Sequence, residues 1–388
     1  MQLLLSEEQL AIQGMAREFV ERCVTPFARD WDRAEEVDSG IIKKLGDAGF
    51  LGLTIPHEYG GSEGSSLDYC LVLEELARGD SSVRGIVSVS LGLVAKTILT
   101  YGNDEQKDRW LPALVSGTAV GSFGLTEPDT GSDAGSLSTT ARLTGDTYRI
   151  NGSKTFITNG TWADVILVFA RTSDDGGRGI SAFLVPTETP GVERRSVTGK
   201  LGLRGQSTAE FTFTDVEVPA TARLGEVGRG MSIAMAALAK GRMSVAAGCV
   251  GIASGALAAA LKYASQRRQF GRTIDEFQLV QQMLADMAVE ADAARLMVWR
   301  VAELIDGGHP FTTQSSMAKY FASEVAVRVS NTALQVFGGY GFVDEFPAEK
   351  YVRDARVMTL YEGTSQIQQL LIGRALTGKS AFMTDGAR

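Results

Sequence analysis

The sequence has little of what builds a metal centre or a disulfide framework. Among its 388 residues the three cysteines, Cys23, Cys70 and Cys249, lie far apart, and the two histidines, His57 and His309, do not complete a ligand set with them. We therefore expect no metal site, no disulfides and a reducing, cytoplasmic compartment. The opening segment MQLLLSEEQ lacks a basic region and a long apolar run, so a secretory signal is not expected.

Positive charge is also scarce. The 38 lysines and arginines are outnumbered by 46 aspartates and glutamates, which leaves a net charge of −8. Such a chain lacks the basic face that nucleic-acid binding requires, so we expect no nucleic-acid partner. The hydrophobic fraction of 44% and the charged fraction of 22% are those of a globular protein, and the length predicts more than one packed unit.

One stretch, Met243 to Leu261, carries no charge and is long enough to cross a bilayer. It consists mostly of alanine and glycine, which gain little from contact with lipid but let helices approach closely. We therefore expect a buried bundle helix here and no membrane span.

Helical and β-rich segments follow one another along the chain. Apolar periodicity predicts helices at Gly40–Gly49, Ser66–Arg78, Val83–Tyr101, Met231–Gln266, Gln278–Asp306 and Thr313–Phe337. From Val120 to Gly225, short β-rich runs alternate with Gly, Asn, Asp and Pro, which is typical of an antiparallel barrel or sandwich. We predict an α+β protein with an N-terminal α-helical domain (1–118), a central antiparallel β domain (119–226) and a C-terminal four-helix-bundle domain (227–388).

Two local patterns add detail to this plan. Asn151-Gly152 lies between two β-rich runs and predicts a hairpin turn, because both residues tolerate positive φ. Glu74, Glu75 and Arg78 predict a polar side for the helix at Ser66–Arg78.

Three motifs occur in order along the chain. They read GLTEPDTGSD from Gly124 to Asp133, QVFGGYG from Gln335 to Gly341 with Arg353-Asp354-Ala355 after it, and YEGTSQIQ from Tyr361 to Gln368. With the α–β–α order and the length, they make the whole chain resemble the acyl-CoA dehydrogenase family. No GxGxxG motif follows a predicted strand, so no nucleotide-binding motif indicates a cofactor. FAD is implied by the resemblance to the family alone.

The resemblance implies that Glu362, in the third motif, removes the α proton of a small acyl-CoA thioester while a hydride passes to the flavin. Apolar surroundings raise the pKa of a carboxylate toward the working range, which suits a base. The backbone N–H of Glu362 and a flavin hydroxyl would hold the thioester oxygen. Without the resemblance, Glu362 would cap or flank a helix that begins near Thr364. Some relatives carry the base at a position that is Gly241 here, just before Arg242, and glycine accepts no proton.

The same resemblance assigns the other contacts. FAD would be bound by Phe123, Leu125, Thr126, Phe156, Thr158, Arg267, Gln269, Phe270, Gln278, Gln335, Gly338, Gly339, Thr364 and Gln366. The substrate would be bound by Ser132, Arg242, Tyr361, Gly363 and Arg84. Simpler readings exist for some of these residues: a hairpin core for Phe156, a turn for Ser132, an exposed helix end for Arg267 and a salt bridge for Arg242.

Arg84 is the residue that bears on the acyl group. A similar segment in the glutaryl-CoA branch of the family places an arginine there, which pairs with the far carboxylate of the substrate. Arg84 therefore suggests a dicarboxylic acyl-CoA, and plain surface charge on a helix start is the alternative.

The resemblance also implies partners. The segment around Arg267 would hold the FAD of a neighbouring subunit, which implies a homotetramer, and an electron-transfer flavoprotein would accept the electrons. Two other functions stay open at this point: an oxidase acting on acyl-CoA or acyl-carrier-protein thioesters, and a non-catalytic protein that binds acyl thioesters.

Overall fold

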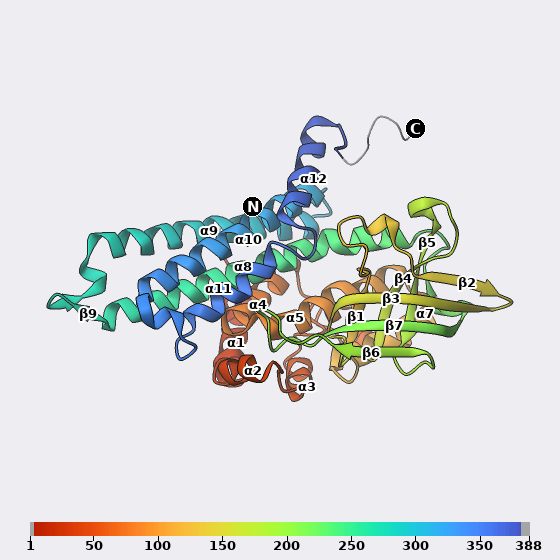
Figure 1. Cartoon of the computed structure of the whole chain (residues 1–388), viewed down its shortest axis with the longest axis horizontal. Coiled ribbons are helices and arrows are strands. Elements are labelled where there is room, and N and C mark those ends of the chain that lie inside the picture. The colour runs from red at the N-terminus through yellow and green to blue at the C-terminus, as the bar shows by residue number, and fades with distance from the viewer. Residues whose placement is uncertain (1–3, 382–388) are drawn as a thin grey trace.

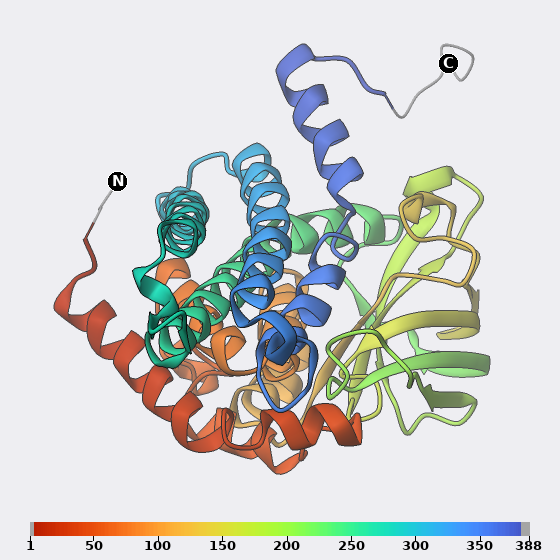
Figure 2. The same ribbon diagram turned by 60° about the vertical axis from the view of Figure 1, so that its left-hand side comes forward.

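The computed structural model describes residues 4–381 and arranges them in the predicted order of helices, sheet and helices (Figure 1). The α+β class is therefore confirmed. The extreme ends of the first and third predicted domains, residues 1–3 and 382–388, lie outside the described residues. The sheet lies at one end of the molecule, and long helices run from it toward the other end (Figures 1 and 2).

The N-terminal part is built from helices that begin at well-formed caps. The side chains of Ser6, Ser65 and Asn103 each accept a hydrogen bond from the backbone N–H three residues later, and each cap residue donates its own backbone N–H to the side chain of that later residue. The helices are α1 (Glu7–Cys23), α2 (Ala28–Ala34), α3 (Gly40–Asp47), α4 (Ser66–Gly79), α5 (Ser81–Val89), the π turn η2 (Ser90–Ala95), α6 (Lys96–Tyr101) and α7 (Asp104–Ser116). Because η2 joins α5 to α6, the predicted helix at Val83–Tyr101 is continuous but not uniformly α-helical.

The polar side predicted for α4 faces the protein and not the solvent. Glu74 is 6% exposed and Glu75 is 2% exposed. Arg295 bonds to Glu74 at 2.6 Å and Arg17 bonds to Glu75 at 2.7 Å. A polar side facing the solvent is not formed because arginines from other helices pair with these carboxylates and allow them to be buried. The arginines are distant in the sequence, so the pattern within α4 does not reveal the pairing.

The central part is an eight-stranded, mainly antiparallel sheet with the order β6-β7-β3-β2-β4-β5-β8, and β1 pairs with β4. The strands are β1 (Gly121–Gly124), β2 (Thr140–Thr144), β3 (Thr147–Thr158), β4 (Val165–Arg171), β5 (Ile180–Pro186), β6 (Val192–Ser196), β7 (Thr208–Pro219) and β8 (Arg223–Leu224). The β1–β4 and β2–β4 pairings are parallel, so the sheet is not wholly antiparallel as predicted.

The hairpin predicted at Asn151-Gly152 is wrong, because β3 runs straight through these residues. The chain turns instead at Gly145, between β2 and β3, where φ is 63°. Gly152 is needed for another reason: a Cβ there would lie 2.5 Å from the Thr139 hydroxyl. Asn151 pairs with Asp215 across the register shift between β3 and β7, so the sequence signal marks a bulge.

The C-terminal part is a bundle of long helices. It contains α8 (Gly230–Gln266), α9 (Gln278–Asp306), α10 (Thr312–Phe337), α11 (Ala348–Met358) and α12 (Ser365–Thr377), with the short strands β9 (Arg268–Gln269) and β10 (Arg272–Thr273) between α8 and α9. Figure 2 shows α12 projecting from the body of the molecule.

Two helical runs, Ser81–Tyr101 and Gly230–Gln266, are long and apolar enough to cross a membrane by composition alone. Their most apolar windows are 78% and 72% buried inside the protein. They pack together and on α4, so their apolar surface belongs to the core, as expected for the second of them.

Candidate active site

A cleft of about 390 Å³ opens where the sheet meets the helices. Strands β1 and β3, helices α5, α8 and α12, and the turn before α12 all contribute to it. Its apolar lining includes Val89, Leu93, Met235, Leu238 and Val245, none of which the sequence analysis singled out. Leucines and valines at helical spacing look the same in the sequence whether they line a substrate cleft or pack in the core.

Glu362 lies in this cleft, in the turn between α11 and α12. The turn is unusual because Glu362 has a φ of 56° and Gly363 a φ of 87°. A non-glycine residue in this region is disfavoured and is held there by its surroundings. Thr364, and not Glu362, caps α12 by accepting a bond from the Ile367 N–H at 3.2 Å, so the capping alternative for Glu362 is wrong, although the residue does lie just before the helix.

The Glu362 carboxylate lies in an environment suited to a base. Its Oε2 is buried and has no hydrogen-bond partner among residues 4–381. Burial raises the pKa of Glu362 to about 7, while the positive charges of Arg242, Lys319 and Arg84 oppose the rise. A carboxyl group with this pKa exchanges protons readily near neutral pH.

Two residues that the sequence analysis missed hold the turn. Lys319 on α10 is fully buried, and its Nζ donates to the Gly363 carbonyl at 2.8 Å. The Gln368 side chain donates to the carbonyls of Glu362 and Gly363, both at 3.1 Å. A lysine among small residues on α10 was the available signal for Lys319, since its neighbours on that face are Ser315, Ser316, Ala322 and Ser323.

Gly241 lies directly against Glu362. A Cβ at position 241 would lie 2.7 and 2.8 Å from the two carboxylate oxygens and 2.9 Å from Leu93. The space that a side chain would take at position 241 is thus filled by the side chain at position 362. The structure gives a steric reason why glycine stands here when the carboxylate is supplied by the turn.

Arg84 is buried at 2% exposure, which excludes the surface-charge alternative. Its Nη2 donates to the Tyr361 hydroxyl at 2.6 Å, and its Nε has no partner in the described part of the chain. No carboxylate lies within 4.0 Å of it among residues 4–381, although it lines the cleft. Gly248 makes room for it, because a Cβ there would lie 2.9 Å from Nε.

The residues predicted to face the flavin lie together on the sheet side of the cleft. The lining on that side includes Phe123, Leu125, Thr126, Phe156 and Thr158. Phe156 is 68% exposed and has a φ of 57°, so an aromatic ring is held open to the cleft at a conformational cost. An exposed ring beside hydroxyl groups fits a flat, partly polar aromatic group such as a flavin.

Beneath this wall is a buried ion pair. Lys154 on β3 is fully buried and donates to Glu127 at 2.7 Å and to the Leu125 carbonyl at 3.1 Å. Glu127 also accepts bonds from the backbone N–H groups of Ser138 and Thr139. Although burial opposes it, Lys154 and these hydrogen bonds lower the pKa of Glu127 to about 2.

The predicted substrate residues Ser132, Arg242, Tyr361 and Gly363 also line the cleft. Arg242 is 7% exposed and forms no ion pair within 4.0 Å among the residues that the structure describes, so the salt-bridge reading is wrong. Its Nη1 donates to the Ser316 hydroxyl at 3.4 Å.

The remaining predicted FAD residues lie elsewhere in the same chain. Arg267, Gln269, Gly338 and Gly339 line a separate surface pocket at the end of the bundle opposite the sheet (Figure 1). Gln335 is exposed near the end of α10, Phe270 is 93% exposed, and Gln278 begins α9. Thr364 and the exposed Gln366 lie at the start of α12, outside the cleft lining. One chain therefore does not bring the two groups of residues together.

Among residues 4–381, no group of three or more His, Cys, Asp or Glu side chains is placed to hold a metal ion. The charged side chains that line the cleft are Glu362, Arg84, Arg242 and Arg374, and Lys319 acts on Glu362 from outside the lining.

Comparison with known proteins agrees with this architecture over the whole chain. The acyl-CoA dehydrogenase N-terminal, middle and C-terminal domain models match residues 6–118, 122–216 and 228–377. Probable acyl-CoA dehydrogenase YngJ of Bacillus subtilis is 45% identical over 376 residues, 96% of this chain and 98% of that protein. The short-chain specific acyl-CoA dehydrogenase of Clostridium acetobutylicum is 42% identical over 369 residues, 95% of this chain and 97% of that protein.

Solved structures give the same result. Butyryl-CoA dehydrogenase from Megasphaera elsdenii matches with a TM-score of 0.95 and 41% identity, covering 97% of this chain and all of that one (100%). A glutaryl-CoA dehydrogenase from Mycobacterium smegmatis in complex with FADH2 matches at 0.94 and 35% identity, covering 98% and 97%. A chain from the structure of the electron transferring flavoprotein of Acidaminococcus fermentans matches at 0.96 and 45% identity, covering 98% and 100%.

Fold and cleft together define a flavoprotein oxidoreductase that acts on the CH–CH group of an acyl thioester. The chain belongs to the acyl-CoA dehydrogenase family, whose members are FAD-dependent and take part in fatty acid metabolism.

Proposed function

We propose that this protein dehydrogenates a short acyl-CoA thioester between its α and β carbons, with Glu362 as the catalytic base. The observation that carries the proposal is the buried, unpartnered Oε2 of Glu362 in the cleft. FAD, when bound along the wall of Phe123, Leu125, Thr126, Phe156 and Thr158, supplies the acceptor for the β hydride.

The chain's own residues provide the remaining steps. Glu362 accepts the α proton on Oε2. The Glu362 backbone N–H, which donates to no other group within residues 4–381, is available to the thioester oxygen as negative charge develops on it. Lys319 and Gln368 keep this turn in its strained conformation through the carbonyls of residues 362 and 363. Leu93, Leu238 and Met235 exclude water from the reacting carbons.

The function is tested by anaerobic titration of the FAD-loaded protein with butyryl-CoA, followed by the loss of flavin absorbance. We expect Glu362→Gln to slow flavin reduction by about 10²–10⁴-fold while FAD content stays unchanged. Glu188→Gln, an exposed glutamate in the β domain, is the matched control. A wild-type rate in Glu362→Gln would rule out the assignment of the base. Peroxide formation at the rate of turnover in air would instead favour the oxidase alternative.

We also propose that Arg84 binds an anionic acyl end, such as the far carboxylate of a dicarboxylic acyl-CoA. Its support is a buried guanidinium that lines the cleft and lacks a carboxylate partner within the described residues. Leaving such a charge unpaired is costly, so a neutral acyl chain should bind less well.

Glutaryl-CoA and butyryl-CoA, compared as substrates, test this role of Arg84. We expect Arg84→Met to reduce kcat/KM for glutaryl-CoA by about 10²-fold or more and to change that for butyryl-CoA far less. Gly248→Ala keeps the arginine but crowds its Nε, and it should weaken the same preference. Wild-type preference for butyryl-CoA, unchanged in both variants, would contradict the proposal.

The proposal extends to partners. The surface pocket of Arg267, Gln269, Gly338 and Gly339 would bind the FAD of a neighbouring subunit in a cytoplasmic homotetramer, together with Phe270, Gln278, Gln335, Thr364 and Gln366. An electron-transfer flavoprotein would accept the electrons. The separation of this pocket from the cleft in one chain, and the exposed Phe270, support a shared site.

A further inference from the structure

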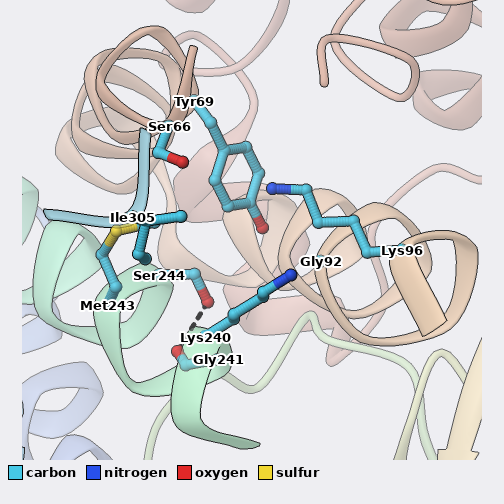
Figure 3. A pocket seen from close by; sticks show the side chains of 9 residues that line it. All are labelled: Ser66, Tyr69, Gly92, Lys96, Lys240, Gly241, Met243, Ser244 and Ile305. Carbon is cyan, nitrogen blue, oxygen red and sulfur yellow. Dashed lines mark hydrogen bonds between the residues drawn. The ribbon is translucent and has the colours of Figure 1, made fainter. Parts of the chain in front are cut away.

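A second, much smaller cavity, with a volume of about 30 Å³, lies behind the cleft that contains Glu362 (Figure 3). We call the larger cleft the acyl cleft. We call it the rear chamber and define it by Tyr69 of α4, Gly92 of η2, Lys96 of α6, and Lys240, Gly241 and Ser244 of α8. No residue lines both the rear chamber and the acyl cleft. The chamber is therefore separate from the site of dehydrogenation, although Gly241 borders Glu362 on its other side.

Hydrogen-bond donors converge on this chamber. Figure 3 shows the Lys96 ammonium beside the Tyr69 ring and the Lys240 side chain extending into the same space. The Lys96 Nζ lies 4.9 Å from the ring centroid. Tyr69 is 2% exposed, and its hydroxyl makes no well-aligned hydrogen bond among residues 4–381, although the Ser244 hydroxyl lies close enough to act on it. A buried hydroxyl without a well-aligned partner is costly, which favours a further hydrogen-bonding group in the chamber.

The two lysines of the chamber lack a direct counter-ion. Neither Lys96 nor Lys240 forms an ion pair within 4.0 Å in the described part of the chain. Burial and the nearby Lys240 lower the pKa of Lys96 to about 8, while Cys70 and Asp306 act in the opposite direction. Asp306 acts on Lys96 only from beyond ion-pair distance, and it accepts the backbone N–H of Ser66 at 2.9 Å.

We propose that the rear chamber binds one small monovalent anion, with chloride as the simplest case, held by Lys96, Lys240 and the Tyr69 hydroxyl. The volume matches one water-sized particle, and two ammonium groups without an ion-pair partner favour an anion over a neutral water molecule. A carboxylate at the end of an acyl chain would carry the same charge, but the chamber and the cleft share no lining residue.

The direct test is a bromide-soaked crystal of the FAD-loaded protein, examined by anomalous scattering. We expect a bromide peak beside the Tyr69 hydroxyl in the wild-type protein. The peak should be absent in the double variant that carries Tyr69→Phe and Lys96→Met. Bromide peaks at exposed lysines alone, such as Lys262, would mean an adventitious ion only and would overturn the proposal. Displacement of the bromide by glutaryl-CoA would also overturn it, because the chamber would then belong to the acyl site.

A solution measurement keeps the proposal testable without crystals. The melting temperature should rise by roughly 1–2 °C when chloride replaces the bulky anion gluconate at constant ionic strength. The rise should persist in Lys262→Met, the exposed control on α8, and disappear in Lys96→Met. If Lys96→Met does not fold, Tyr69→Phe takes its place. An equal rise in every variant would contradict a specific site.

Discussion

The role proposed for Glu362 as a base depends on its position more than on its residue type. Its carboxylate is buried beside Arg242, Lys319 and Arg84, and burial dominates over these cations to raise its pKa to about 7. The left-handed backbone at residues 362 and 363 is maintained by bonds from α10 and α12, so the local sequence does not supply this geometry alone.

The raised pKa predicts the pH dependence of turnover. Only the ionised Glu362 accepts a proton, so kcat/KM should fall about tenfold per pH unit below about pH 7 and level off above it. Stopped-flow measurement of flavin reduction between pH 5 and pH 9 checks this pH dependence, because the range covers roughly two pH units on each side of the Glu362 pKa. A flat profile through pH 7 would show that another group sets the rate.

Lys319 is expected to position the turn and to tune the base. Its positive charge lowers the pKa of Glu362, so Lys319→Met should shift the acidic limb of the pH profile to higher pH and reduce kcat. Burial lowers the pKa of Lys319 to about 8, so its charged form costs stability below that pH and the variant should melt no lower than wild type at neutral pH.

The exposed Lys262→Met is the control for that experiment. A lower melting temperature with an unchanged pH profile would assign Lys319 a structural role only.

At the scale of elements, the buried pair of Lys154 and Glu127 ties β3 to the loop that follows β1. This loop carries Leu125 and Thr126, and the Thr126 carbonyl accepts the Thr155 N–H at 2.9 Å. The pair therefore fixes, from behind, the wall that is proposed to face the flavin.

Glu127→Gln should destabilise the protein by about 3–5 kcal/mol, because it leaves the Lys154 charge buried and unpaired. The double variant with Lys154→Met should recover much of the loss, which a double-mutant cycle in denaturant would measure. FAD content should fall in the single variant. Equal loss in the single and double variants would show that the pair is not coupled.

At the scale of the whole molecule, large apolar side chains remain uncovered away from the cleft. Leu279 and Val289 on α9 are 71% and 70% exposed, and Leu376 on α12 is 74% exposed. Exposed large apolar side chains of this kind are typical of a subunit interface. The separate pocket at Arg267 adds a reason for assembly, since the proposed FAD site is incomplete in one chain.

Leu279→Asp should therefore dissociate the proposed tetramer and lower FAD content together, as measured by light scattering and flavin absorbance. Leu143→Asp is the matched control, because Leu143 is 55% exposed but lies on β2, in the sheet. Retention of native size in Leu279→Asp, or dissociation in both variants, would contradict an interface on α9.

The sequence by itself determined the order of elements and most of their bounds. The helix at Gln278–Asp306 begins and ends as predicted, because apolar periodicity and helix-forming residues are local properties. The motifs also placed Glu362 and the flavin-side residues in one cleft by resemblance to a known family.

Only the tertiary structure decided which side chains meet. Arg84 and Glu74 are buried because distant segments enclose them, Asn151-Gly152 is a bulge because β7 and β2 pass beside it, and Lys319 reaches the turn from another helix. The rear chamber likewise forms only where α4, η2, α6 and α8 pack together. Contacts between residues far apart in the sequence leave no local pattern, so they cannot be predicted from any one segment of the chain.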